Sequence, residues 1–233
     1  MHILHIIYIH VTCVLRNMIQ DDAREQELIK LFNLHRPENS GRSGTDAILK
    51  LDGNEIHFEL KSTTRGSVTT VRDFGPDHIQ KWRGKHWLIG FYDNHKRLLY
   101  CIYGSPAMMD PWINEKANYV KVDFALAELV PSMITHDLMY ELVGKKASYS
   151  LQDAKNLQKK QYNVQRYREM MDLPSGYSPD RMLEILKDRC KYLILRGSTL
   201  NNPHIPESYF RGCERITSNH PDRLRDLVRA AIE

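Results

Sequence analysis

Cysteine is scarce in this sequence: there are four in 233 residues, at positions 13, 101, 190 and 213, and none forms a C-x-x-C pair. Because the chain carries no secretory signature, we expect these residues to be reduced thiols of a cytoplasmic protein. Cys190, His204, Cys213 and His220 can be combined into a candidate metal site, but their spacing matches no zinc pattern. The cysteines therefore argue against a disulfide-stapled fold and give little support to a zinc protein.

The sequence also lacks a hydrophobic run long enough to span a membrane. Its most apolar stretch, MHILHIIYIHVTCVL, opens the chain and falls short of the roughly 20 residues that a transmembrane helix needs. No Lys or Arg precedes this stretch, as a signal peptide would require. Two interpretations of residues 1–17 stay open: a buried strand, or a segment outside a native protein that begins at Met18. Neither predicts a membrane protein.

Charge of one sign is only slightly in excess. Lys and Arg number 33 against 29 Asp and Glu, which gives a formal charge of +4. This balance suits a polyanionic partner without identifying one. No internal repeat or low-complexity linker divides the chain, and its composition is that of an ordinary globular protein. The length fits one large domain, or a core with a smaller appendage.

The first half of the chain has a clear pattern of elements. A helix is expected over residues 19–34, followed by a loop over 35–44 that contains Pro, Asn, Ser and Gly. Two extended segments then flank Asp52-Gly53-Asn54, which is a strong hairpin signal. The pattern continues with a strand, a helix that opens at Pro76 and closes at Gly84, and two more strands; the strands are expected at 67–73, 86–93 and 97–104.

The second half gives a weaker pattern, mainly helical. We expect a strand running into a turn over residues 120–130 and a short helix over 131–143, then a long basic helix over 150–171. Ser178 is a plausible N-cap, with Pro179 at the first position of a helix that ends near 194. A terminal helix is expected over 220–233. The fold class predicted is α/β (α+β), with a central mixed sheet flanked by helices and a mainly helical C-terminal half.

Three residues of the hairpin carry the chemistry. Asp46 begins the first strand, and Glu59 and Lys61 share one face of the second because side chains alternate along a strand. Across the hairpin Asp46 is expected to lie opposite Glu59. Two converging carboxylates make an oxygen site suited to Mg²⁺, and the lysine beside them can orient a metal-bound water or stabilise charge on a phosphate. The alternative is that Glu59 and Lys61 belong to a solvated outer face.

The spacing of Asp46 and Glu59-Leu60-Lys61 resembles the PD-(D/E)xK nuclease signature. Thr45 stands where that signature has proline, and the resemblance covers somewhat under half of the chain. The helix, hairpin, strand, helix and strand order is similar to the core of that superfamily. The resemblance implies a restriction-endonuclease-like core over residues 18–104, with Asp46 and Glu59 as ligands of Mg²⁺.

Two further residues are weaker candidates for catalysis. Glu25 falls on the apolar face of the first helix, where many members of the superfamily place another acid, with an ordinary surface position as the alternative. Gln80 resembles a glutamine that related nucleases hold near the scissile phosphate, with a polar helix surface as the alternative. Candidate contacts to DNA are hydroxyl and basic side chains, although each can also be a solvated group: Arg42, Ser43, Thr63, Arg65, Arg72, Lys81, Lys159 and Arg166.

These observations favour a Mg²⁺-dependent, site-specific endonuclease of the type II restriction kind that cuts double-stranded DNA. Residues 105–233 would supply recognition and dimer contacts, packed on the core as one compact unit. A homodimer is the expected state for a palindromic target. The alternatives are a structure-specific or repair nuclease of resolvase type on the same core, a DNA-binding protein without catalysis, and an α/β domain with an unrelated role.

Overall fold

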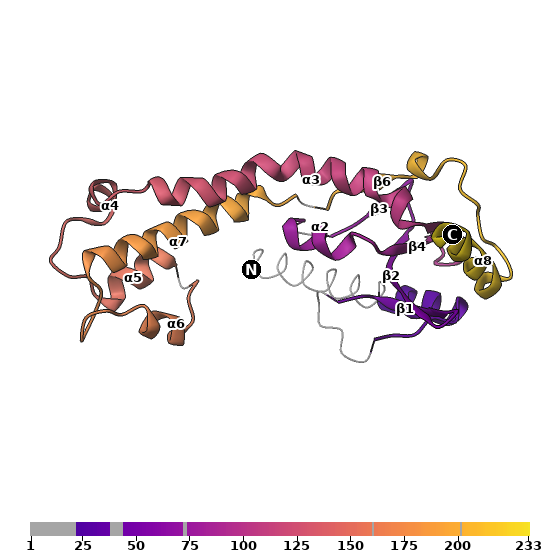
Figure 1. Ribbon diagram of the computed structural model, residues 1–233, viewed down its shortest axis with the longest axis horizontal. Helices are drawn as coiled ribbons and strands as arrows, with labels where there is room; N and C mark the ends of the chain where they lie inside the picture. The colour runs from indigo at the N-terminus through magenta and orange to yellow at the C-terminus, as the bar shows by residue number, and fades with distance from the viewer. Residues whose placement is uncertain (1–21, 38–43, 72–73, 160, 201) are drawn as a thin grey trace, which may run out of the picture. The chain divides into compact units, whose positions relative to one another are not determined.

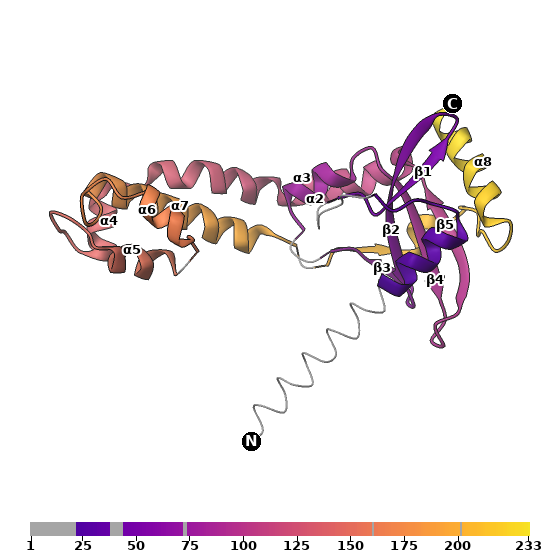
Figure 2. The same cartoon turned by 90° about the horizontal axis from the view of Figure 1, so that it is seen from below.

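A four-stranded mixed sheet forms the centre of the larger of two units in the computed structural model. The structure describes residues 22–37, 44–71, 74–159, 161–200 and 202–233 (Figures 1 and 2). The sheet order is β1-β2-β4-β5, with bounds Ala47–Leu51, Asn54–Thr63, His86–Tyr92 and Leu98–Gly104. The mixed sheet flanked by helices agrees with the predicted fold class. The interpretations of residues 1–17 concern residues outside the described part.

The β1–β2 hairpin is the predicted one. Asp52 and Gly53 form its two-residue loop, and both have positive φ, at 50° and 81°. Such a loop favours Gly because a residue without a Cβ adopts this conformation at little cost, and its twist matches that of the strands. The loop fixes the register of the hairpin so that Ala47 pairs with Phe58. The paired register ends there, and Asp46 lies just before it, with its backbone N–H donating to the Phe58 carbonyl.

A crossover then brings β4 parallel to β2. Helix α2 (Pro76–Trp82) lies between these strands in the sequence, with Pro76 in its first turn. All seven residues of β4 are buried, as expected for a strand covered on both faces. The third extended segment is shorter than predicted, because β3 covers only Ser67–Thr69. It pairs with β6 (His204–Pro206) in a separate two-stranded sheet instead of joining the main one.

Two apolar clusters cover the two faces of the main sheet. One contains Leu28 of the helix at 22–31 and Phe32 directly after it, together with Leu224 and Val228 of α8 (His220–Ile232). Figure 2 shows α8 beside the sheet strands. The other cluster gathers the three tryptophans, from α2, β4 and helix α3, whose bounds are Pro106–Leu129. The tryptophan rings lie 5.1–6.4 Å apart, within the usual range for aromatic contacts.

The smaller unit, Asn118–Thr199, is helical and has its own apolar cluster. It contains the end of α3, a 3-10 turn, and four helices with bounds His136–Val143 (α4), Leu151–Gln158 (α5), Val164–Glu169 (α6) and Pro179–Ser198 (α7). Helix α7 begins as predicted, because the Ser178 side chain accepts a hydrogen bond from the Arg181 backbone.

Two predictions for this unit were wrong. The strand expected over 120–130 is part of α3 and of the 3-10 turn that follows it. The long helix expected over 150–171 is two short helices: Lys159 ends α5 in the left-handed conformation, and Asn163 caps the start of α6. A residue with positive φ does not continue a right-handed helix, so the basic pattern is interrupted.

The division into units differs from the boundary expected between residues 104 and 105. The first unit extends to Ala117 and also includes Leu200–Glu233, which returns to it through the β3–β6 pairing and the bridge between Cys101 and Ile216. These pairings join residues more than 100 positions apart, so local sequence patterns give no sign of them. Within the described residues, no helix is both long and apolar enough to cross a bilayer.

Gly176 marks a close backbone approach in the smaller unit. A Cβ at this position would lie 2.3 Å from the Tyr149 carbonyl oxygen, whereas a Cβ at Gly197 would meet nothing within 4 Å. We therefore expect Gly176→Ala to lower the free energy of unfolding by about 1–3 kcal/mol, as overpacking does. Gly197→Ala is the control and should leave it unchanged or raise it by up to about 1 kcal/mol. Urea unfolding measures both, and equal values for the two variants would contradict the expected clash.

Candidate active site

Asp46 is held against β2 by two hydrogen bonds on either side of Glu59. Its backbone N–H donates to the Phe58 carbonyl at 3.2 Å, and its Oδ2 accepts from the Leu60 N–H at 2.9 Å. The second bond fixes the orientation of the carboxylate. Its other oxygen, Oδ1, faces the Lys81 ammonium at 3.5 Å.

Glu59 is almost fully buried: its side chain is 2% exposed. In the parallel pairing of β2 with β4, Glu59 lies beside Trp87 and Lys61 beside Ile89, which places both on the face that α2 covers. The predicted shared face of Glu59 and Lys61 is therefore confirmed. The alternative of a solvated outer face does not hold for Glu59.

Three lysines surround the Glu59 carboxylate. Lys61 donates to Oε1 at 2.7 Å, and the ammonium groups of Lys81 and Lys85 lie 3.2 and 3.8 Å from Oε2. Burial alone would raise the pKa of Glu59, but the positive charges of Lys61, Lys81 and Lys85 outweigh it, so the pKa is well below its ordinary value. The carboxylate is therefore ionised at neutral pH.

The lysines respond to burial in different ways. Burial disfavours the charged form of Lys61, yet the carboxylates of Glu59 and Asp46 raise its pKa above the ordinary value. For Lys85 burial is the larger effect and its pKa is lowered. Lys85 also donates to the Gly44 carbonyl at 3.3 Å, so it links the segment before Asp46 to the buried glutamate.

Glu25 approaches this group from the helix at 22–31. Burial, followed by the negative charge of Asp46, raises its pKa to about 6, although Lys61 and Arg36 act in the opposite direction. Its carboxylate also lies 3.8 Å from the Arg36 guanidinium. Glu25 is thus partly buried and electrostatically coupled to the Asp46 region.

The other predicted site residues have varied surroundings. Gln80 is exposed on α2. Thr63 is buried, and its hydroxyl is used inside the chain, where it donates to the Ser67 carbonyl and accepts from the Arg65 N–H. Arg65 is exposed. Arg42, Ser43 and Arg72 lie outside the described residues.

Lys159 and Arg166 belong to the smaller unit. Lys159 is the exposed C-cap of α5, and Arg166 lies 3.8 Å from Asp188 and over the Tyr162 ring. Lys81, expected only as a DNA contact, lies instead between the two carboxylates.

Sequence reasoning missed Lys85. The signal was the spacing K-W-R-G-K over residues 81–85. Gly84, with a φ of 71°, ends the helix and turns the chain into β4. Because α2 packs on the face that holds Glu59, both ends of this short segment bring a lysine to the same carboxylate.

The oxygens of this site fit a small divalent cation. Glu59 Oε2 accepts no hydrogen bond from any described residue, and Asp46 Oδ1 has an ion pair with Lys81. Mg²⁺ commonly binds through one or two carboxylates and keeps several waters. The described residues contain no group of three or more His, Cys, Asp or Glu that would enclose a metal ion by itself. Asp46 Oδ1 and Glu59 Oε2 are therefore the oxygens here that could contact a divalent cation.

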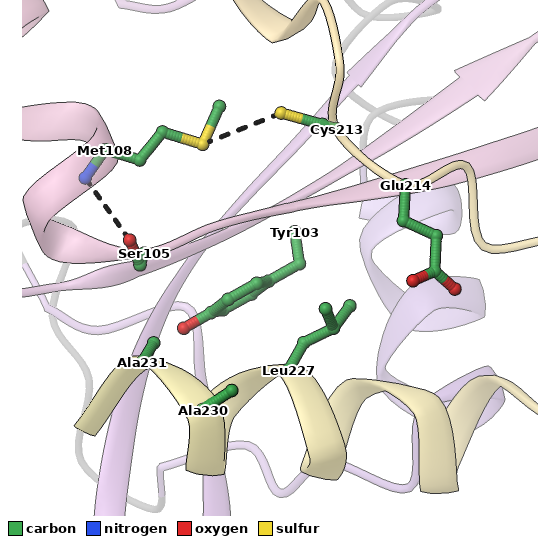
Figure 3. A pocket seen from close by; sticks show the side chains of 8 residues that line it. All are labelled: Tyr103, Ser105, Met108, Cys213, Glu214, Leu227, Ala230 and Ala231. Carbon is green, nitrogen blue, oxygen red and sulfur yellow. Dashed lines mark hydrogen bonds between the residues drawn. The ribbon is translucent and has the colours of Figure 1, made fainter. Parts of the chain in front are cut away.

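A pocket of about 320 Å³ lies elsewhere in the first unit and has a different character (Figure 3). Its walls are mostly apolar, and none of the candidate catalytic residues lines it. Its charged lining residue, Glu214, is paired with Arg223. The lining residues are Tyr103, Ser105, Met108, Cys213, Glu214, Leu227, Ala230 and Ala231.

Comparison with known proteins adds no relative: no family model matches the chain, and a search of curated proteins finds no similar sequence.

The raised pKa of Glu25 predicts a specific pH dependence of stability. A carboxyl group whose pKa is higher in the folded than in the unfolded state stabilises the fold below its unfolded pKa, near 4.5, and this contribution disappears as pH rises to about 6. Glu25→Gln removes the titration. The unfolding free energy of the variant, measured relative to the native protein, should therefore rise between pH 4.5 and 6 and stay level above that range. A difference that does not change with pH would contradict the raised pKa.

Proposed function

We propose that this protein is a Mg²⁺-dependent nuclease with a PD-(D/E)xK type of core, whose catalytic residues are Asp46, Glu59 and Lys61. The observation that carries the proposal is the convergence of the Asp46 and Glu59 carboxylates, with the Lys61 ammonium 2.7 Å from one glutamate oxygen. The hairpin and the parallel crossover to β4 through α2 support such a core.

The charge of the site favours an anionic substrate. The two carboxylates of Asp46 and Glu59 are surrounded by three ammonium groups, from Lys61, Lys81 and Lys85, which leaves an excess of one positive charge. A bound Mg²⁺ would add positive charge and supply a more acidic water as the source of the nucleophile. Asp46 and Glu59 would hold the ion, and Lys61 would stabilise negative charge on the reacting phosphate.

Within this class we propose a site-specific endonuclease of the type II restriction kind, acting on double-stranded DNA. Such an enzyme needs surface beyond its catalytic core to contact base edges. The helical unit provides additional surface, with Lys159 and Arg166 both exposed. A structure-specific nuclease of resolvase type, a repair nuclease and a non-catalytic DNA-binding protein are the alternatives.

Cleavage assays separate these possibilities. Phage DNA and branched DNA are incubated with the full chain and Mg²⁺, with EDTA as the control. Discrete fragments support the restriction type, a smear a nonspecific nuclease, and cleavage of branched DNA alone a resolvase. If the protein binds DNA but cleaves no substrate, the proposed nuclease activity is wrong and the non-catalytic DNA-binding alternative is supported.

Lys61→Met tests the catalytic assignment. We expect cleavage to fall by about a hundredfold or more, because the variant loses the charge that stabilises the reacting phosphate, while DNA binding is retained in a mobility-shift assay. Lys50→Met is the matched control: Lys50 is an exposed lysine of the neighbouring strand β1, and its replacement should leave cleavage unchanged. Full activity of the Lys61 variant would remove this residue from the site.

A homodimer follows from a palindromic target, because two copies related by a two-fold axis present one active site to each strand. Sedimentation of the full chain with its DNA should give two copies per duplex. One copy per duplex would favour a nuclease that acts on one strand at a time.

A further inference from the structure

The Lys81 ammonium occupies a different position from those of the other two lysines. It lies 3.5 Å from Asp46 Oδ1 and 3.2 Å from Glu59 Oε2, and so bridges the two carboxylates. Lys61 donates to the other oxygen of Glu59, and Lys85 is 3.8 Å from Oε2 and donates to the Gly44 carbonyl. Only Lys81 pairs with both acids among the described lysines.

The two oxygens that Lys81 faces are those that the rest of the site leaves available. Asp46 Oδ2 already accepts from the Leu60 N–H, and Glu59 Oε1 accepts from Lys61. A divalent cation shared by Asp46 and Glu59 would therefore use Oδ1 and Oε2. Mg²⁺ binds oxygen at about 2.0–2.1 Å, so an ammonium group between the same oxygens cannot stay in place when the ion binds.

The position of Lys81 allows it to leave. It is the second-last residue of α2, and its side chain is 16% exposed, so it is not fully enclosed. A lysine carries its charge on a flexible four-carbon stem, and rotation about that stem moves the ammonium without displacing Trp82, which is buried in the tryptophan cluster.

We propose that Lys81 is an internal counter-cation, which holds Asp46 and Glu59 together in the absence of metal and is displaced when a divalent cation binds. It is a positioning residue, and the inference rests on the proposed function insofar as it takes Asp46 and Glu59 as the metal ligands. Its consequence is a lower apparent affinity for the metal, because the ion binds only to the fraction of molecules in which Lys81 has left.

Metal titration of the full chain without DNA tests this inference. Calorimetry with Mg²⁺, and separately with Ca²⁺, is carried out on the native protein and on Lys81→Met, Lys85→Met and Lys50→Met. We expect Lys81→Met to bind about tenfold more tightly, as it would if Lys81 occupied the site in nine molecules of ten. Lys85→Met removes a charge of the same sign near Glu59 and should change the affinity much less, and Lys50→Met should not change it.

Thermal unfolding supplies a second readout. In EDTA, Lys81→Met should unfold at a lower temperature than the native protein, because two neighbouring carboxylates have lost a counter-charge. Saturating Mg²⁺ should raise its midpoint more than that of the native protein. Lys81→Arg keeps the positive charge and serves as the variant that preserves the fold; its metal affinity should not exceed that of the native chain.

Several results would overturn the inference: unchanged or weaker metal binding by Lys81→Met, an equal gain in Lys85→Met, tighter binding by Lys81→Arg, or no metal binding by any variant. An equal gain in Lys85→Met would indicate a general charge effect without a shared position. If Lys81→Met binds metal more tightly while the protein cleaves no DNA, that result would support the counter-cation role of Lys81 and would overturn only the proposed nuclease activity.

Discussion

The central constraint on this fold is the burial of the Glu59 carboxylate on the sheet face that α2 covers. Removing a carboxylate from water costs several kcal/mol unless opposite charges accompany it. Here the compensation comes from Lys61 on the same strand and from Lys81 and Lys85, which the crossover brings to it. The β2–α2–β4 connection and the charge on β2 therefore depend on each other. If α2 did not cover this face, Glu59 would need solvent instead.

A buried ion pair is a poor way to gain stability, because well-packed apolar side chains of similar volume often serve as well or better. The face that holds Glu59 also carries the tryptophan cluster, so an apolar residue would have suitable neighbours there. The proposed catalytic role would account for a carboxylate surrounded by three lysines at such a position, since perturbed ionisable groups collect at functional sites. The raised pKa of Glu25 beside the same group is consistent with this interpretation.

The parts of this arrangement that depend on local patterns were predictable from the sequence. Asp52-Gly53 specifies a two-residue loop because both residues adopt positive φ, and that loop fixes the register up to Ala47 and Phe58, the neighbours of Asp46 and Glu59. Alternation along β2 then assigns Glu59 and Lys61 to one face. The capped start of α7 at Ser178 is equally local. The nature of that face was not predictable, because it depends on where α2 packs after the crossover.

The short third strand and the different unit boundary share a physical cause, which is pairing between distant segments. The third extended segment finds its partner in β6, more than 130 residues later, and the segment after residue 200 returns to the first unit. Neither the spacing of hydrophobic residues nor the residues of a turn indicates which distant segment a strand pairs with. The interrupted basic helix is a different case: Lys159 adopts a conformation that a helical pattern does not reveal, and Asn163 starts a new helix only four residues later.

The position of Lys81 joins these points to the proposed chemistry. In the absence of metal, its ammonium moderates the repulsion between Asp46 and Glu59, so the acids can be held close before any ion arrives. Displacement by a divalent cation would leave this lysine on the same helix, next to a site that has become more positive. An anionic substrate would relieve the repulsion between the displaced ammonium and the ion. Binding of metal and binding of substrate should then reinforce each other, because an anionic substrate reduces the repulsion between the bound ion and the displaced ammonium. A site arranged in this way would stay assembled without metal and would become strongly cationic only with a bound metal.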